Sequence, residues 1–313
     1  MNTIEVTGLV KRYRELIALD NFDLTVAPGE IFGLLGPNGS GKTTVINCIL
    51  QLLTYDKGSI RLFDEDMTPT RYDLKRRIGI VPQEVAVFAQ LTVAENIDYF
   101  CSLYIEDKSK RRELVEEAIE FVGLQDYRRF RPRKLSGGLL RRLNIACGIV
   151  HQPELIFFDE PTVAVDPQSR NAILEGIQRL NKQGSTIVYT SHYMEEVEQI
   201  CTRIMIMDHG KALATGTNFE LKSLIGMNER IEIELAHGND HETTIEMVKE
   251  LPHTSSARLD GDTLRITCSR GSHNLSETLS ALQAADVAYG RVYSEPPTLN
   301  DVFLEITGKE LRD

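Results

Sequence analysis

The chain has 313 residues, of which 42% are hydrophobic and 26% are charged, and its formal net charge is −11. This length suits one large or two modest domains, and the apolar content is sufficient for a buried core. The acidic balance argues against a surface that mainly binds nucleic acid, because such a surface needs an excess of Lys and Arg to neutralise phosphates.

The cysteines and the N-terminal residues are typical of a cytosolic protein. The five cysteines form no C-x-x-C pair and lie near no His cluster with metal-ligand spacing, so we expect reduced, buried thiols. The first residues lack the basic and apolar regions of a signal peptide. No apolar run approaches the ~20 residues of a membrane-spanning helix, so we expect any connection to a membrane to come through a partner.

The first predicted elements frame a glycine-rich loop. Residues 4–13 and 20–26 alternate like strands, and a short apolar run at 30–35 reads as a third strand. Residues 44–53 have the pattern of a helix, whose positive N-terminal end favours phosphate. The loop between the third strand and this helix is therefore placed to bind an anion.

This loop fits G-x-x-x-x-G-K-[ST], the phosphate-binding P-loop. Its glycines let several backbone N–H groups face one triphosphate. Lys42 can bind the β- and γ-phosphates, and the Thr43 hydroxyl is suited to Mg²⁺. The predicted nucleotide-binding residues of the loop are Gly36, Pro37, Asn38, Gly39, Ser40, Gly41, Lys42, Thr43 and Thr44.

A helical insert follows. Strands are predicted at 58–63 and 76–83, the second ending at Pro82, and the pattern is helical from 92 to 152. Thr92 and Glu95 have the spacing of a capping box. A helix over 110–122 should turn one apolar face to the core; its members are Leu114, Ala118, Phe121 and Val122.

Two apolar runs, 155–158 and 186–189, read as buried parallel strands, and 204–207 as a further strand. Together with the P-loop they predict an α/β P-loop NTPase core, interrupted by a helical subdomain at about 90–152. The first run ends in Asp159 and Glu160, a Walker B pattern. Asp159 is placed for Mg²⁺, whereas Glu160 should point elsewhere, because side chains alternate along a strand, and could activate a water.

Over residues 1–225 the chain resembles the ATP-binding-cassette (ABC) ATPases. The resemblance rests on the P-loop, the Walker B pattern and Leu135-Ser136-Gly137-Gly138, which matches the signature loop before a predicted helix at 139–150. It implies that Tyr13 stacks on adenine and that Gln83 links Mg²⁺ and the γ-phosphate to the helical subdomain. It further assigns ATP contacts to Ser136, Gly137, Gly138 and Asp166, and makes His192 a switch histidine.

The resemblance also implies how the site is completed. In this family the P-loop of one subunit faces the signature loop of the other, so the enzyme needs two copies, or one copy and a related ATPase. Glu160 and His192 are both present, which favours a homodimer. Glu160 would polarise water, and His192 would stabilise the developing charge. One residue departs from the pattern: Leu139 stands where glutamine is common, and leucine cannot hydrogen-bond a ribose hydroxyl.

A second domain is expected from residue 226 to 313. Its predicted elements follow the order β-α-β-β-α-β, with a hairpin turn at 260–262, which suggests a small ferredoxin-like α+β unit with an accessory or regulatory role. A last helix is predicted over 299–306. His237, Asp240 and His241 are more typical of a polar loop than of a metal site.

The C-terminal segment 297–308 and the residues after Walker B resemble ATPases of ABC-2-type drug-resistance and multidrug exporters. This implies export through a separate transmembrane permease, with the chain on the cytoplasmic face of the membrane. The apolar stretch 85–88 lies where the family contacts its permease, although it also fits an ordinary core. The alternatives are an importer ATPase, or a soluble ABC ATPase acting on ribosomes or DNA. The presence of one cassette disfavours an ATPase that acts on ribosomes, and the short insert disfavours one that acts on DNA. The basic run 128–134 is better explained as a solvated face than as a nucleic-acid contact.

Overall fold

The computed structural model describes residues 2–225, 227–236, 241–269 and 274–307. The chain divides into two compact units, Met1–Asn218 and Phe219–Glu310. Residues 237–240, which include two members of the expected polar loop, lie outside the described residues.

The first unit contains an antiparallel sheet with the order β2-β1-β4-β5. β1 pairs with both β2 and β4, and buried side chains alternate with exposed ones along β2, as the sequence pattern predicts. The strands are β1 (Ile4–Tyr13), β2 (Leu16–Val26), β4 (Lys57–Leu62) and β5 (Glu65–Asp66).

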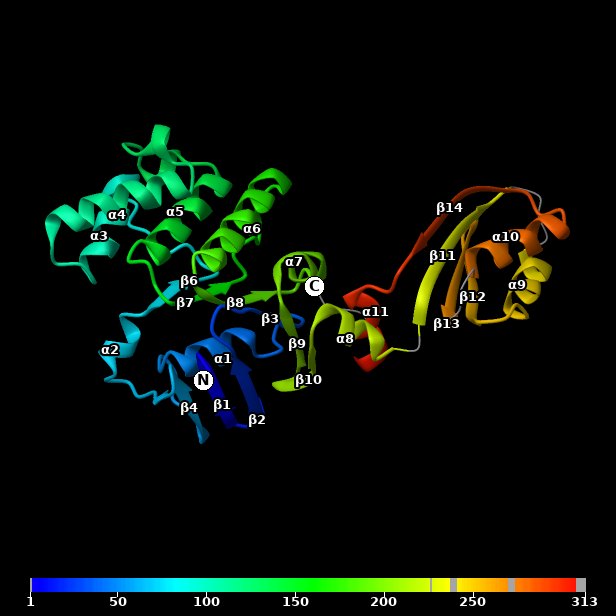
Figure 1. Cartoon of the computed structure of the whole chain (residues 1–313), viewed down its shortest axis with the longest axis horizontal. Helices are drawn as coiled ribbons and strands as arrows, with labels where there is room; N and C mark the ends of the chain where they lie inside the picture. Colours follow the sequence, from blue (N-terminus) through cyan, green and yellow to red (C-terminus); the bar gives the residue numbers. More distant parts are fainter. Residues whose placement is uncertain (1, 226, 237–240, 270–273, 308–313) are drawn as a thin grey trace. The chain divides into compact units, whose positions relative to one another are not determined.

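A second sheet carries the nucleotide-binding motifs and has the order β10-β9-β3-β8-β7-β6 (Figure 1). All of its pairs are parallel except β9 with β10. Every residue of β3, β7 and β8 is buried, which explains why these strands are continuous apolar runs. The strands are β3 (Ile31–Leu35), β6 (Ile78–Val81), β7 (Leu155–Asp159), β8 (Thr186–Ser191), β9 (Arg203–Asp208) and β10 (Lys211–Gly216).

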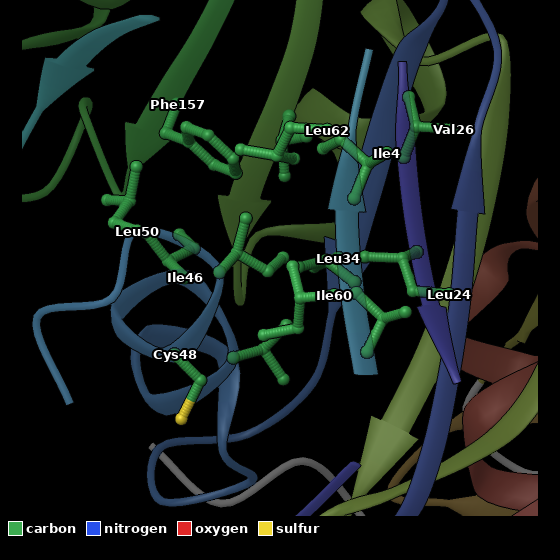
Figure 2. Close-up of a cluster of buried hydrophobic side chains, with 14 of the residues drawn as sticks. Ile4, Leu24, Val26, Leu34, Ile46, Cys48, Leu50, Ile60, Leu62 and Phe157 are labelled. Atoms are coloured by element: carbon green, nitrogen blue, oxygen red, sulfur yellow. The ribbon is translucent and has the colours of Figure 1, made fainter. Parts of the chain in front are cut away.

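One apolar core joins the two sheets around α1 (Lys42–Ile49). Figure 2 shows Ile46 and Leu50 near Phe157 of the parallel sheet, with strand residues such as Ile60 and Leu62 of the antiparallel sheet in the same cluster. The helix that follows the P-loop is therefore fixed by packing on two sides. It ends before residue 53, contrary to the sequence expectation, because Gln51 adopts a left-handed conformation (φ 56°) and Leu52 is exposed.

The helical insert has its own core, formed by α3 (Val93–Ser102), α4 (Lys108–Phe121) and α5 (Gly137–Ile149). The capping box is confirmed: the Thr92 side chain accepts from the Glu95 N–H, and the Glu95 carboxylate accepts from the Thr92 N–H. Leu114 and Ala118 are buried as expected, but Phe121 and Val122 are only half-buried. The Phe121 ring lies under the guanidinium of Arg179, 4.3 Å away.

The remaining helices and short 3₁₀ turns of this unit lie between its strands, and those from α3 to α5 follow one another between β6 and β7. They are α2 (Tyr72–Lys75), α3 (Val93–Ser102), α4 (Lys108–Phe121), η1 (Gln125–Tyr127), η2 (Pro132–Lys134), α5 (Gly137–Ile149), α6 (Pro167–Lys182) and α7 (Met194–Ile200). α8 (Asn218–Ser223) spans the division between the units.

The second unit contains an antiparallel sheet with the order β12-β13-β11-β14. Its hairpin turn lies where the sequence predicts it, with Asp260 opposite Thr263 and Gly261 at φ 61°. The elements are β11 (Met227–Leu235), α9 (His241–Lys249), β12 (Thr254–Asp260), β13 (Thr263–Ser269), α10 (Asn274–Ala284), β14 (Tyr289–Glu295) and α11 (Leu299–Thr307). Alternate residues of β11 and β13 form its core, among them Ile231, Ile233, Leu264 and Ile266.

Candidate nucleotide-binding site

The P-loop connects β3 to α1, and two of its glycines adopt backbone conformations that other residues avoid. Gly39 and Gly41 have φ of 81° and 108°. Gly36 is required for a different reason: a Cβ there would lie 2.2 Å from the Met207 carbonyl oxygen. The Ser40 hydroxyl is buried and has no hydrogen bond among the described residues, so the loop offers an unused polar group.

Lys42 is buried at the start of α1, with 5% of its side chain exposed. Its Nζ donates to the carbonyl oxygens of Gly36 (2.8 Å) and Pro37 (3.1 Å), and lies 3.2 Å from Glu160 Oε1. The ammonium group is thus held inside the loop beside the Walker B carboxylates. This is the position from which a cation can meet a phosphate chain.

The two Walker B carboxylates have different neighbours. Asp159 Oδ2 accepts from the Thr43 hydroxyl (2.8 Å), and its Oδ1 accepts from the Thr190 hydroxyl (2.6 Å). The strand ends at Asp159, and Glu160 has a left-handed backbone (φ 46°) that turns its side chain toward Lys42. Glu160 N–H donates to the Thr190 hydroxyl (2.9 Å), so one threonine fixes both acidic residues.

Glu160 also contacts the two predicted catalytic partners. Its Oε2 lies 3.1 Å from His192 Nδ1 and accepts a long hydrogen bond from Gln83 Nε2 (3.4 Å). Gln83 follows β6 and His192 follows β8, so the carboxyl ends of three parallel strands meet here. This is the edge of an open α/β sheet where ligands bind.

A cleft of about 330 Å³ opens beside these groups. It is lined by Tyr13, Gln83, Glu160 and P-loop residues, which the sequence singled out. It is also lined by Leu16, Ile17, Ala18, His209 and Gly210, which the sequence analysis missed. Leu16 is 65% exposed. The available signal in the sequence was the apolar pair Leu16-Ile17 shortly after the aromatic residue Tyr13.

The signature residues and Asp166 are elsewhere: none of Ser136, Gly137, Gly138 or Asp166 lines this cleft. Ser136 caps α5 by accepting from the Leu139 N–H (3.4 Å), and Asp166 caps α6 by accepting from the Ser169 N–H (2.9 Å). That hydrogen bond lowers the pKa of Asp166. A Cβ on Gly138 would lie 2.5 Å from Ser169 Oγ, so the signature loop packs on the start of α6.

The donor set suits a magnesium-bound nucleotide. Thr43 Oγ1 and Asp159 Oδ2 are hard oxygen ligands only 2.8 Å apart, and Lys42 and the loop N–H groups can meet phosphate. Among the described residues, no group of three or more His, Cys, Asp or Glu could hold a metal alone. Mg²⁺ commonly binds through one or two protein oxygens together with substrate phosphates.

No helix among the described residues is long and apolar enough to cross a membrane.

Two family models match the chain. One, described as "ABC transporter", matches residues 19–163. The other, described as "ATP-binding protein DrrA1-3-like, C-terminal domain", matches residues 216–307. The two matches fall on the two compact units described above.

Similar proteins cover almost the whole chain. The linearmycin resistance ATP-binding protein LnrL of Bacillus subtilis is 36% identical over 312 residues, which is 99% of this chain and 100% of that protein. Nod factor export ATP-binding protein I of Sinorhizobium fredii is 34% identical over 314 residues, 99% and 87% respectively. Among solved structures, the dimeric post-hydrolysis state of the ATP-binding cassette MJ0796 bound to ADP and Pi matches with a TM-score of 0.63 and 25% identity, covering 68% of this chain and 98% of that one.

Proposed function

This chain belongs to the ATP-binding proteins of ABC transporters, in the drug-resistance and Nod factor export group, and we propose that it powers export through a separate ABC-2-type permease. It is an ATPase of the ABC type. Both of its units match models from this family, and similar proteins span its full length.

One observation carries the proposal for how the ATPase works. The P-loop, Gln83, Glu160 and Tyr13 line one cleft, whereas the signature residues and Asp166 lie away from it. One chain therefore presents two separate parts of a site. A second copy would bring its Ser136, Gly137, Gly138 and Asp166 to the cleft of the first, and the dimeric structure of a similar cassette supports the pairing of two copies.

In the proposed complex Tyr13, which is 44% exposed at the mouth of the cleft, stacks on adenine. The P-loop N–H groups and Lys42 hold the phosphates, while Thr43, Asp159 and Gln83 hold Mg²⁺, directly or through water. The bound Mg²⁺ supplies charge neutralisation at the β- and γ-phosphates.

We assign Glu160 as the group that orients and deprotonates the attacking water, and His192 and Gln83 as its partners. Glu160 keeps one oxygen near Lys42 and the other near His192. A bound phosphate can therefore replace Glu160 as the partner of Lys42, while the carboxylate keeps its contact with His192. We also assign to the His192 ring the stabilisation of charge that develops on the γ-phosphate.

The names of the similar proteins, one for linearmycin resistance and one for Nod factor export, support export of a compound of this kind. We place the chain on the cytoplasmic face of the membrane, attached through its permease. Phe88, which is 42% exposed and packs edge-on against Tyr99 with ring centroids 4.8 Å apart, lies in the stretch after Gln83 where we expect that contact.

We further propose that residues 1–225 form the ATPase domain and 226–313 an accessory domain with a ferredoxin-like fold. The element order β-α-β-β-α-β and an antiparallel sheet with β11 and β13 at its centre support the ferredoxin-like assignment. Its proposed role is regulation or dimer contact.

Affinity purification of the full chain from detergent-solubilised membranes tests the proposal. A polytopic membrane protein recovered in stoichiometric amount is the expected result. Recovery of ribosomes or DNA in place of a membrane protein would contradict it and favour a soluble ABC ATPase.

A further inference from the structure

A buried carboxylate lies behind the proposed catalytic groups and outside the nucleotide cleft. Glu196 on α7 is 3% exposed, and its Oε2 accepts hydrogen bonds from the hydroxyls of Tyr189 (2.7 Å), Thr162 (2.8 Å) and Ser191 (3.1 Å). All three hydroxyls donate to this one oxygen. Burial, and then the nearby carboxylate, raise the pKa of Tyr189, which keeps its hydroxyl protonated.

The Ser191 hydroxyl links Glu196 to the turn that carries His192. Since its proton is donated to Glu196, its oxygen accepts from the Tyr193 N–H, 2.9 Å away. Ser191 and Tyr193 flank His192, whose ring lies 4.1 Å from the Tyr193 ring and whose Nδ1 is 3.1 Å from Glu160 Oε2. The backbone on both sides of His192 is therefore fixed by one carboxylate.

The other oxygen of Glu196 faces the helix that begins at Asp166. Its Oε1 lies 3.2 Å from Arg170 Nε, although neither atom makes an aligned hydrogen bond with any residue that the structure describes. The Arg170 guanidinium also lies over the Tyr193 ring at 4.8 Å, and the Arg170 N–H donates to the Asp166 carbonyl in the first turn of α6. Glu196 and Arg170 thus connect the Asp166 turn to the His192 turn within one chain.

We propose that Glu196 is a positioning residue for ATP hydrolysis, which orients His192 toward Glu160 through Ser191 and, through Arg170, couples that orientation to the turn of Asp166. The proposal rests on the proposed roles of Glu160 and His192. Glu196 does not line the nucleotide cleft, so it should affect the rate of hydrolysis more than the binding of ATP.

Two hydroxyl deletions on the same carboxylate oxygen provide the matched test. Ser191→Ala removes the link to the His192 turn, whereas Tyr189→Phe removes an equally buried hydrogen bond that does not reach that turn. In the full-length protein we expect Ser191→Ala and Glu196→Gln to lower kcat roughly tenfold or more, with KM for ATP within about threefold of wild type. Tyr189→Phe should stay within about twofold in kcat. Equal losses of kcat in Ser191→Ala and Tyr189→Phe would overturn the proposal, and this comparison stands even if Glu196→Gln fails to fold.

A double-mutant cycle separates this proposal from the proposed function. If Glu196 acts through His192, Ser191→Ala should cause no further loss of kcat in a His192→Ala background. A further loss there would show that the carboxylate acts by another route. Wild-type turnover of His192→Ala would overturn the catalytic role of His192 and this proposal together. Loss of turnover in His192→Ala with wild-type turnover in Ser191→Ala would overturn only the role of Glu196.

Discussion

Replacing Glu160 with glutamine removes the proposed base while leaving a side chain of the same shape. Glu160 is almost fully buried, with Lys42 Nζ 3.2 Å from one oxygen and His192 Nδ1 3.1 Å from the other. Glutamine can still accept from Lys42, which also keeps its two carbonyl acceptors in the P-loop. We therefore expect Glu160→Gln to fold.

Glu160→Gln should leave the affinity for ATP unchanged or raise it, whereas it should lower turnover. Two unit charges 3.2 Å apart attract by about 5 kcal/mol at an effective dielectric of ~20, before desolvation is counted. ATP must compete with this attraction for Lys42, so its removal should leave ATP affinity unchanged or raise it. Loss of a general base lowers turnover by roughly 100- to 10,000-fold, or about 2.7–5.4 kcal/mol in the barrier.

Three measurements check this prediction: phosphate release for turnover, equilibrium titration for nucleotide affinity, and gel filtration with MgATP for the dimer. Glu160→Gln should bind ATP at least as tightly as wild type, release little phosphate and elute as a stable ATP-bound dimer. Glu154→Gln, which removes a partially exposed carboxylate paired with Arg77, is the matched control and should resemble wild type. Near-wild-type turnover of Glu160→Gln would show that another group activates the water.

Lys42→Ala should weaken ATP binding by about tenfold or more, because it deletes the buried ammonium at the phosphate position; wild-type affinity in a nucleotide titration would contradict this. Leu139→Gln should change the rate of hydrolysis less than tenfold, because the backbone N–H of this residue, which the substitution leaves in place, donates to the Ser136 hydroxyl. A larger change in phosphate release would show that this position controls turnover. Burial lowers the pKa of His151 to about 4, whereas the unfolded value is near 6.5. Protons then favour the unfolded chain, so this residue's contribution, on the order of 3 kcal/mol, is complete above about pH 6.5 and lost as the pH falls toward 4. His151→Phe should make the unfolding free energy less dependent on pH over that range. Denaturant titrations at several pH values measure this, and a pH dependence equal to that of wild type would refute the assignment.

Much of the first unit could be predicted from sequence because its signals are local. The P-loop, the Walker B strand and the capping box are each set by residues close together in the chain, and the structure has them at the expected positions. The end of α1 could not be predicted, since the apolar pattern continues through Leu52 while the backbone turns at Gln51.

The residues that organise the site were harder to recognise. Thr190 and Glu196 carry no motif of their own. Thr190 bonds Asp159 and Glu160, about 30 residues away in sequence, and Glu196 accepts from the distant Thr162 as well as from the nearby Ser191. The orientation of Glu160 depends on a left-handed backbone after the strand, which strand alternation does not describe. Pattern reasoning therefore finds the groups that face the nucleotide more readily than those that hold them in place.

In the proposed dimer, two copies of the chain complete each other's ATP sites, and a mixing experiment can show whether they do. Gly137 is exposed, and the nearest atom to a Cβ there is the Ala164 carbonyl oxygen at 3.9 Å, so Gly137→Asp should fold while placing a negative charge where the γ-phosphate is expected. Gly137→Asp and Lys42→Ala should each be inactive alone. Mixed after exchange of subunits, they should recover about one quarter of wild-type ATPase, because half of the dimers then contain one intact site of two. A mixture as inactive as its components, with mixed dimers present, would show that the two copies do not share their ATP sites.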